Sequence, residues 1–165
     1  MPIEATRGDI TAERVDAIVN AANNALRRGA GVCGAIFAAA GPQLDAACDA
    51  IGHCATGDAV VTPGFTLAAR WIVHTVGPVW HGGEQGEPDL LASCYRRSLA
   101  VAAESGASSI AFPAISTGIF GYPRRAAAEI AVAATRASDA AGIDLVRFVA
   151  FDADTLRDYE ELLSR

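Results

Sequence analysis

The sequence predicts an α/β protein, a three-layer α/β/α sandwich in which helices cover both faces of a central mixed sheet. Short apolar runs rich in β-branched residues alternate with alanine-rich segments whose apolar residues recur at helical spacing. The alternation continues from end to end without an internal repeat, a low-complexity tract or a linker. The chain of 165 residues has the length of one domain, so residues 1–165 are predicted to form a single unit.

The first elements are two strands and the start of a helix. Ile3–Thr11 is predicted to be a strand that closes in a turn at Gly8, where Asp9 is expected to cap nearby backbone amides. Val15–Val19 begins the second strand, and a helical pattern starts at Cys33 after a glycine-rich loop.

The middle of the chain is expected to hold a helix, two strands and a loop. Pro42–Ile51 is predicted to be a helix with proline in its first turn. Asp58–Thr62 and Trp71–Val76 are β-branched runs and are predicted strands, and Gly77–Asp89 is predicted to be a surface loop.

The remaining elements alternate between helix and strand. In order they are a helix at Leu90–Glu104, a strand at Ile110–Phe112, a helix at Arg125–Ala141 that Gly142 ends, a strand at Leu145–Phe151 and a helix at Asp154–Leu163.

Two glycine-bearing loops follow strands and precede helices. The first contains Gly29-Ala30-Gly31-Val32-Cys33-Gly34, and the second is Pro113–Pro123. Glycine permits close approach of a backbone to a ligand, and a helix start leaves its first amides without intrahelical partners. Since ligands of α/β sheets bind at the carboxyl ends of strands, we expect the two loops to face each other across one anionic ligand.

Composition excludes several classes of function. All 13 basic residues are Arg, so a Walker A loop and Schiff-base chemistry, which both need Lys, are excluded. The net charge of −6 argues against a general nucleic-acid surface. If the chain binds a phosphate, backbone amides must supply most of the hydrogen bonds to it.

No apolar run approaches the roughly 18 residues that span a bilayer, and no signal peptide is evident, so a cytoplasmic protein without membrane contact is expected. The cysteines are expected to be free and reduced. Cys48, His53 and Cys54 match no zinc module, so neither a metal nor a cofactor is expected. His74 and His81 are expected to be hydrogen-bonded or exposed rather than catalytic, because no motif provides a partner.

The first loop also matches Gly-x-Gly-x-x-Gly, which leaves an NAD-dependent Rossmann-type oxidoreductase as a remote alternative. A dinucleotide-binding turn places its first glycine directly after the strand, whereas Asn24–Arg28 intervene here. The interval where a second strand should end in an acidic residue is helical instead.

Several motifs together resemble the macrodomains of the MacroD-type group over nearly the full length. They are Gly8-Asp9-Ile10-Thr11, Val19-Asn20-Ala21-Ala22-Asn23, Gly29-x-Gly31-Val32-x-Gly34, Trp71-Ile72-Val73-His74-Thr75-Val76-Gly77-Pro78 and Ile115-Ser116-Thr117-Gly118-Ile119-Phe120-Gly121-Tyr122-Pro123. The resemblance implies a three-layer fold that binds ADP-ribose in a cleft at the strand ends.

The resemblance also implies a role for each matched position. Asp9 would accept from the adenine amino group, the Ile10 amide would lie near adenine, and Phe151 would pack on the ring beside Asp152. Asn23 would hold the hydroxyls of the distal ribose, which Phe120 would border. The remaining ligand-binding positions, most of them amides for the diphosphate, would be Ala21, Gly29, Ala30, Gly31, Val32, Cys33, Ser116, Thr117, Gly118, Ile119 and Gly121.

Members of this group hydrolyse mono-ADP-ribose from protein carboxylates, and an acidic residue follows the Gly-Gly-Val of their first loop. Here Cys33 holds that position, and Phe37 stands where histidine is frequent. A thiol with a reference pKa near 8.5 is mostly protonated at neutral pH and is a poor base, although a helix start can lower that pKa. The catalytic set implied by the resemblance is therefore Asn23, Gly31 and Cys33, with the thiol either reactive or only filling space.

Two functions stay open. The first is hydrolysis of mono-ADP-ribose esters of Glu and Asp side chains, with deacetylation of O-acetyl-ADP-ribose as a related outcome. The second is a non-catalytic ADP-ribose reader. The expected partners are ADP-ribose and ADP-ribosylated proteins, with ADP-ribosylated nucleic-acid ends as a further class, and a monomer is expected.

Overall fold

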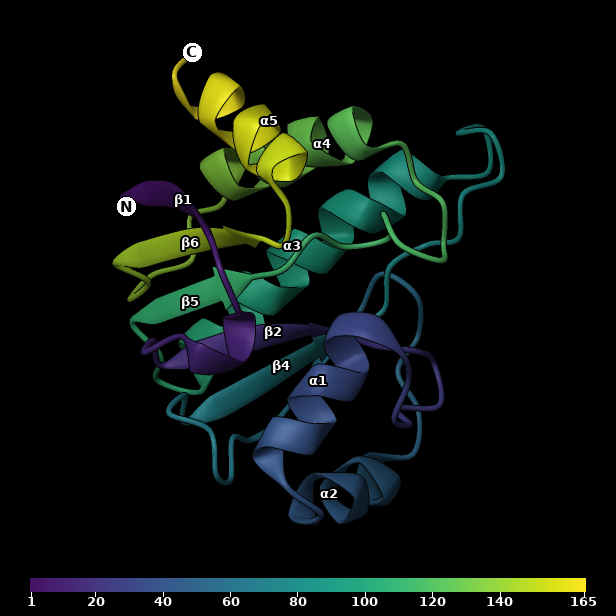
Figure 1. Ribbon diagram of the computed structural model, residues 1–165, viewed down its shortest axis with the longest axis vertical. Helices are drawn as coiled ribbons and strands as arrows, with labels where there is room; N and C mark the ends of the chain where they lie inside the picture. The colour runs from purple at the N-terminus through teal and green to yellow at the C-terminus, as the bar shows by residue number, and fades with distance from the viewer.

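The computed structural model describes residues 1–165, and it arranges a six-stranded sheet between two layers of helices (Figure 1). The elements in chain order are β1 (Ile3–Arg7), the 3-10 turn η1 (Ile10–Ala12), β2 (Ala17–Ala21), α1 (Gly31–Ala40), α2 (Gln43–Ile51), β3 (Ala59–Pro63), β4 (Trp71–Thr75), α3 (Glu87–Glu104), β5 (Ser109–Phe112), α4 (Arg124–Ala137), β6 (Leu145–Ala150) and α5 (Ala153–Leu163).

The strand order across the sheet is β1-β6-β5-β2-β4-β3. Every neighbouring pair is parallel except β3 and β4, which are antiparallel. The sheet is therefore mixed, as predicted. Because β1, β6, β5 and β2 are parallel neighbours, their carboxyl ends share one edge of the sheet, where ligands of α/β proteins bind.

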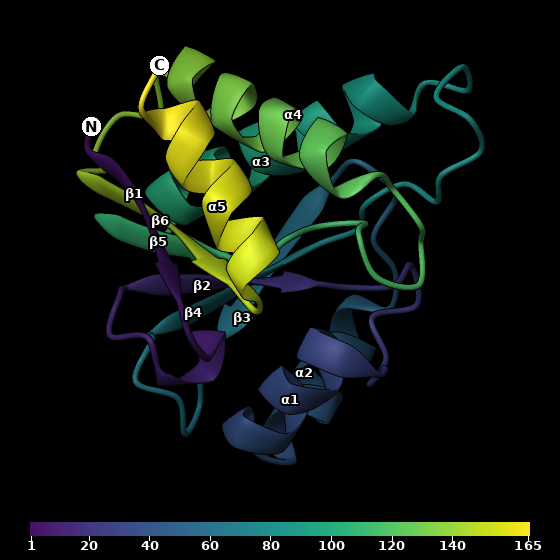
Figure 2. The ribbon, with the colours of Figure 1, turned by 45° about the horizontal axis from the view of Figure 1, so that its top comes forward.

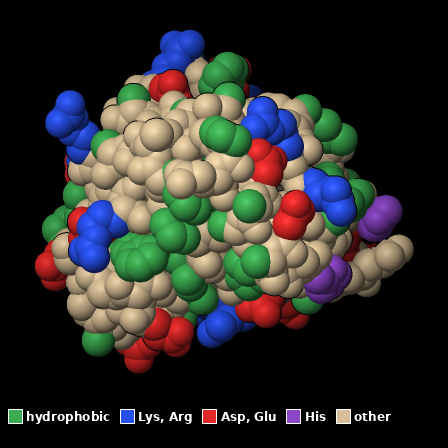
Figure 3. All heavy atoms as spheres, turned by 90° about the horizontal axis from the view of Figure 1, so that it is seen from below, with side chains coloured by type: hydrophobic (Ala, Val, Ile, Leu, Met, Phe, Trp, Pro, Cys, Tyr) green, Lys and Arg blue, Asp and Glu red, His purple; other side chains and the backbone are tan.

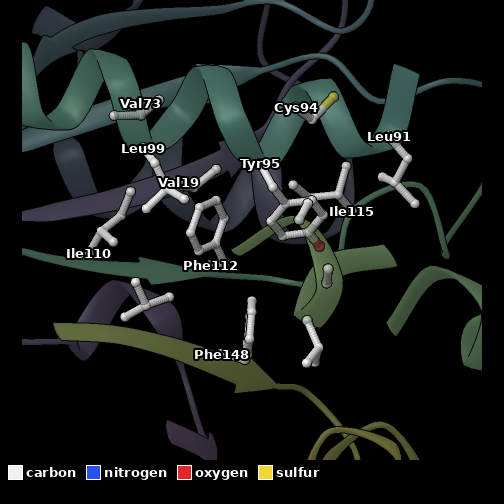
Figure 4. Close-up of a cluster of buried hydrophobic side chains, with 14 of the residues drawn as sticks. Val19, Val73, Leu91, Cys94, Tyr95, Leu99, Ile110, Phe112, Ile115 and Phe148 are labelled. Carbon is white, nitrogen blue, oxygen red and sulfur yellow. The ribbon is translucent and has the colours of Figure 1, made fainter. Parts of the chain in front are cut away.

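Helices α3, α4 and α5 cover one face of the sheet, and α1 and α2 cover the other (Figures 1 and 2). Alternate residues of a strand supply the two faces: Val19 belongs to the core under α3, α4 and α5, whereas Ile18 belongs to the core under α1 and α2. Aromatic rings fill the larger core. Tyr95 of α3 lies with its ring centroid 4.9 Å from that of Phe112 and 6.2 Å from that of Phe148 (Figure 4).

The predicted first strand is too long. β1 ends at Arg7, although the Gly8 amide still donates to the Ala150 carbonyl at 3.0 Å. Residues Ile10–Ala12 form a 3-10 turn because the Asp9 carboxylate accepts from the amide of Thr11 at 2.9 Å and from its hydroxyl at 2.7 Å. The capping role predicted for Asp9 is confirmed, and it ends the strand.

Helix boundaries also differ from the prediction, two of them by three or more residues. Helix α4 ends at Ala137 rather than Ala141, because Ser138 turns extended and its hydroxyl accepts from the Ala140 amide at 3.3 Å. Helix α3 begins at Glu87 rather than Leu90. Gly86 takes a left-handed conformation there, and Pro88 occupies the first turn, where its missing N–H costs nothing.

The two ends of the chain lie side by side, at the amino-terminal end of β1 and the last turn of α5 (Figures 1 and 2). A shallow hollow lined by Met1, Ile3, Arg136, Ser138 and Leu163 separates them. Since α5 starts directly after β6 and runs back across the sheet, this hollow is at the opposite end from the strand carboxyl ends. None of the helices is long and apolar enough to cross a membrane.

Candidate functional site

The residues singled out in the sequence converge on the shared carboxyl edge of β1, β6, β5 and β2. Asp9 follows β1, Phe151 follows β6, Ser116 lies in the loop after β5, and Asn23 follows β2. Their order along the edge is the order of the strands. The edge therefore presents, in sequence, an acid, an aromatic ring and two glycine-bearing loops.

The first loop is closed by Asn23. Its side-chain oxygen accepts from the Arg27 amide at 3.0 Å, and its side-chain nitrogen donates to the Arg27 carbonyl at 2.8 Å. Leu26 lies between them in a left-handed conformation, with φ of 57°, and its side chain is buried. One amide hydrogen and one oxygen lone pair of Asn23 remain for a ligand.

Glycines bring this loop onto the start of α1. A Cβ on Gly34 would lie 2.5 Å from the Gly29 carbonyl oxygen, so only glycine permits the contact. Gly31 has φ of 61°, a conformation that other residues rarely adopt.

Six consecutive amides at the start of α1, from Arg28 to Cys33, donate no hydrogen bond within the chain. The N-cap residue, Ala30, offers no side-chain acceptor either. Because the helix dipole also favours negative charge at this end, the helix start is suited to an anion.

The second loop presents another row of free amides. No amide from Ser116 to Phe120 donates within the chain, whereas those of Gly121 and Tyr122 close the loop on the Gly118 and Ser116 carbonyls at 3.0 and 2.9 Å. Ser116 is left-handed, with φ of 69°, and its buried hydroxyl has no partner. Strain and an orphaned hydroxyl together are typical of a functional loop.

The far end of the edge carries an exposed aromatic residue. Phe151 is 84% exposed, which is unusual for phenylalanine and leaves its ring available to a planar ligand. Next to it, Asp152 caps α5 by accepting from the Thr155 amide at 2.7 Å, and this bond lowers the pKa of Asp152 below its ordinary value. Ile10 is buried, so it can offer a ligand only its backbone amide, which donates to nothing in the chain.

Cys33 lies under the first loop rather than on its surface. The side chain is buried, with Sγ 3.7 Å from the Arg27 carbonyl oxygen and 3.7 Å from the side-chain nitrogen of Asn20. Phe37, one turn further along α1, is also buried, and the Arg28 guanidinium lies 5.7 Å from the centre of its ring. All four cysteines are free and buried.

A buried histidine supports this region. Asn20 donates from its side-chain nitrogen to His74 Nδ1 at 3.1 Å, and Thr62 Oγ1 lies 2.9 Å from His74 Nε2. Because the Thr62 hydroxyl donates to the Pro63 carbonyl, it accepts from His74, which is then neutral and protonated on Nε2. Burial lowers the pKa of His74 to about 4. The predicted hydrogen-bonded role of His74 is confirmed, and it is not at the strand edge.

On the face that Figure 3 shows, basic side chains do not form a cluster. They are spread singly over this face and alternate with acidic ones.

The sequence pattern missed one contributor to the site, the segment after β4. Trp80 donates its amide to the Phe120 carbonyl at 2.8 Å, and its ring centroid lies 4.6 Å from that of Tyr122. The residues between Trp80 and α3 have the polar, glycine-rich composition of an ordinary surface loop, which gave no signal of this contact.

Comparison with known proteins gives a consistent family. The model of the Macro domain matches residues 19–131. A Macro domain-containing protein of Chlorobaculum tepidum is 52% identical over 164 residues, which cover 98% of this chain and 95% of that protein. The O-acetyl-ADP-ribose deacetylase of Salmonella typhimurium is 50% identical, over 99% of this chain and 94% of that protein.

Two solved structures share the fold and contain nucleotides. The Oceanobacillus iheyensis macrodomain with ADP has a TM-score of 0.89 and 40% identity, and the match covers 97% of this chain and 88% of that one. The Trypanosoma brucei macrodomain in complex with ADP-ribose has a TM-score of 0.91 and 40% identity, covering 98% of this chain and 68% of that one.

Proposed function

The chain belongs to the macro domain family, and from that premise we propose that it binds ADP-ribose and hydrolyses mono-ADP-ribose esters of Glu and Asp side chains. ADP-ribosylated proteins are then its partners. A relative named as an O-acetyl-ADP-ribose deacetylase supports ester hydrolysis as the class of reaction.

One observation carries the binding proposal. Two rows of amides without partners, Arg28–Cys33 and Ser116–Phe120, follow the neighbouring strands β2 and β5. A diphosphate between them would receive hydrogen bonds from both sides without any Lys. The order of the edge fits the rest of the ligand, with adenine toward Asp9 and Phe151 and the distal ribose toward Asn23.

The proposed reaction needs little from a strong base. A water held by a ligand phosphate oxygen attacks C1″ of the distal ribose, the bond from C1″ to the protein carboxylate breaks, and the water proton passes to that phosphate oxygen. The departing carboxylate is a good leaving group. Asn23 and the loop amides fix the ribose, so positioning and electrostatics supply the rate enhancement.

The buried thiol of Cys33 favours a space-filling role, because it is only 6% exposed and lies against the Arg27 carbonyl. The same replacement of an acid by Cys33 is the observation that supports the second candidate, an ADP-ribose reader without turnover.

The test compares turnover with binding. Incubation with a Glu-linked mono-ADP-ribosylated protein and, separately, with O-acetyl-ADP-ribose should release ADP-ribose. The Cys33→Ala variant should keep both binding and activity. An inactive Cys33→Ala protein that still binds ADP-ribose would assign the thiol a catalytic role. If the wild-type protein binds ADP-ribose but leaves both substrates unchanged, the non-catalytic reader function is supported instead.

Calorimetry separates this family of functions from the remote oxidoreductase alternative. ADP-ribose should bind more tightly than NAD, because NAD carries the bulky nicotinamide at C1″ of the distal ribose, where ADP-ribose has a hydroxyl. Tighter binding of NAD, or no binding of ADP-ribose, would contradict the proposal.

A further inference from the structure

A buried carboxylate organises the segment between β4 and α3. Glu87 is only 1% exposed, although its carboxylate forms no ion pair. Instead it accepts from three backbone amides, those of His81 at 2.8 Å, Gly83 at 2.9 Å and Gln85 at 2.6 Å. The predicted surface loop is therefore folded around an anion of its own.

The backbone of this loop is shaped for that contact. Gly82, Gly83 and Gly86 all have positive φ, between 82° and 97°, so the chain can curl and point successive amides at one acceptor. Burial by itself raises the pKa of Glu87, but the amide hydrogen bonds outweigh it and lower the pKa to about 2. Glu87 is consequently ionised at neutral pH.

The loop in turn fixes Trp80. A Cβ on Gly83 would lie 2.7 Å from the Trp80 ring, so the glycine allows the backbone to approach the indole closely. Trp80 also contacts the second amide loop, through the hydrogen bond from its amide to Phe120 and the contact of its ring with Tyr122. Gly77 adds a close contact, because a Cβ there would lie 2.1 Å from Ser116 Oγ.

We infer that Glu87 is a positioning residue for the second amide loop: by holding residues 81–85 it places Trp80, whose bond to the Phe120 carbonyl orients the free amides of Gly118–Phe120 toward the ligand. This inference deepens the proposed function and rests on it. Glu87 does not touch the ligand in this scheme, and its effect reaches the site through Trp80.

Glu87→Gln keeps the size of the side chain and removes its charge. The Gln side-chain NH2 cannot accept, so at least one buried amide of the loop loses its acceptor. The dissociation constant for ADP-ribose should rise about tenfold, the change that corresponds to roughly one lost hydrogen bond to a charged group. In the free protein, the amide resonances of Gly118, Ile119 and Phe120 should shift, and those of Gly31 and Val32 should not.

Asp16→Asn is the matched control. Asp16 also accepts from a backbone amide, that of Ser108 at 2.8 Å, and from the Ser108 hydroxyl at 2.9 Å, but it joins loops at the amino-terminal edge of the sheet. Its substitution should lower thermal stability and leave ADP-ribose affinity within about twofold, since it removes similar bonds far from the ligand.

A Trp80→Ala variant and the double variant test the route. If Glu87 acts through Trp80, the losses of affinity should not add, because the second substitution removes a contact that is already lost. Glu87→Asp, which keeps the charge on a shorter side chain, should lie between the wild type and Glu87→Gln, and it also serves if Glu87→Gln fails to fold.

The outcomes distinguish the two proposals. A wild-type protein that does not bind ADP-ribose contradicts the proposed function itself. Wild-type binding, together with unchanged affinity in folded Glu87→Gln or a loss equal to that of Asp16→Asn, overturns the positioning role alone. Additive effects of Glu87→Gln and Trp80→Ala would also overturn it.

Discussion

At the scale of single residues, buried polar side chains tie neighbouring strands of the sheet together. His74 joins Asn20 on β2 to Thr62 on β3, so one neutral imidazole ties together strands on both sides of β4. Its role depends on remaining neutral, because an imidazolium has no acceptor nitrogen to offer Asn20. A buried histidine of this kind makes stability depend on pH.

We therefore expect stability to fall as the pH drops from about 6.5 toward about 4. The pKa of folded His74 is about 4, below its ordinary 6.5, so the unfolded chain takes up the proton first. Between about pH 7.5 and about pH 5, His74 alone should remove about 2 kcal/mol from the free energy of unfolding. Urea unfolding across this range measures it. His74→Gln should be less stable at neutral pH but show a flatter profile, and an equally steep profile would contradict the assignment.

Ser116 gives a second prediction at this scale. Glycine would relieve its left-handed backbone, with φ of 69°, and would remove a buried hydroxyl without a partner. Ser116→Gly should therefore stabilise the protein by about 1 kcal/mol, after allowance for the flexibility that glycine adds to the unfolded chain. Thermal unfolding checks the gain, and calorimetry with ADP-ribose shows whether the hydroxyl is used. A stabilised variant with weaker binding would mean that the ligand is the hydrogen-bond partner of the Ser116 hydroxyl. A destabilised variant would show that the left-handed backbone of Ser116 is not strained.

At the scale of elements, the site depends on where helices and strands end. The start of α1 provides free amides because the loop before it packs tightly against its first turn, with Gly34 against Gly29. The glycine pattern predicted this loop and helix, since the requirement for glycine is local. The ends of β1 and α4 were predicted wrongly, because Asp9 and Ser138 bond to nearby amides and divert the chain. Such short-range competition is weakly encoded in apolar spacing.

Gly34→Ala tests the contact between the loop and α1. In an exposed helix interior this change would stabilise by about 1 kcal/mol, but here the new methyl group would lie 2.5 Å from the Gly29 carbonyl oxygen. Steric overlap should prevail, with a net loss of about 1–3 kcal/mol in chemical denaturation and weaker ADP-ribose binding. Gly8→Ala is the control for stability, since nothing lies within 4 Å of a Cβ there. Equal stability of the two variants would show that the loop moves to accommodate the methyl group at little cost in free energy.

At the scale of the whole molecule, an acidic protein of net charge −6 is proposed to hold a diphosphate with main-chain groups. The composition favours this, because the chain has no Lys and is acidic overall. The resemblance to macrodomains predicted the layers and the positions at the edge. Glu87 and Trp80 could not be predicted, because their importance arises from contacts between segments distant in sequence, and an acid among glycines is typical of an exposed turn.

Binding should consequently respond to salt in an unusual way. Contacts from cations weaken as ions screen them, whereas short amide contacts inside a loop change little, and the net charges of protein and ligand repel. Between about 50 mM and about 500 mM NaCl, the affinity for ADP-ribose should stay constant or improve by up to about twofold. Calorimetry over this range measures the affinity. Adenosine, an uncharged ligand whose binding should not depend on salt, is the control. A steep loss of affinity with increasing salt would instead show that arginine side chains hold the diphosphate.

The adjacent ends of the chain, beside the hollow lined by Met1 and Leu163, have a practical consequence. A fluorophore, a bead or a second protein attached at either end would sit on the far side from the strand carboxyl ends. The module could then be immobilised or displayed in tandem with its recognition edge pointing into solution.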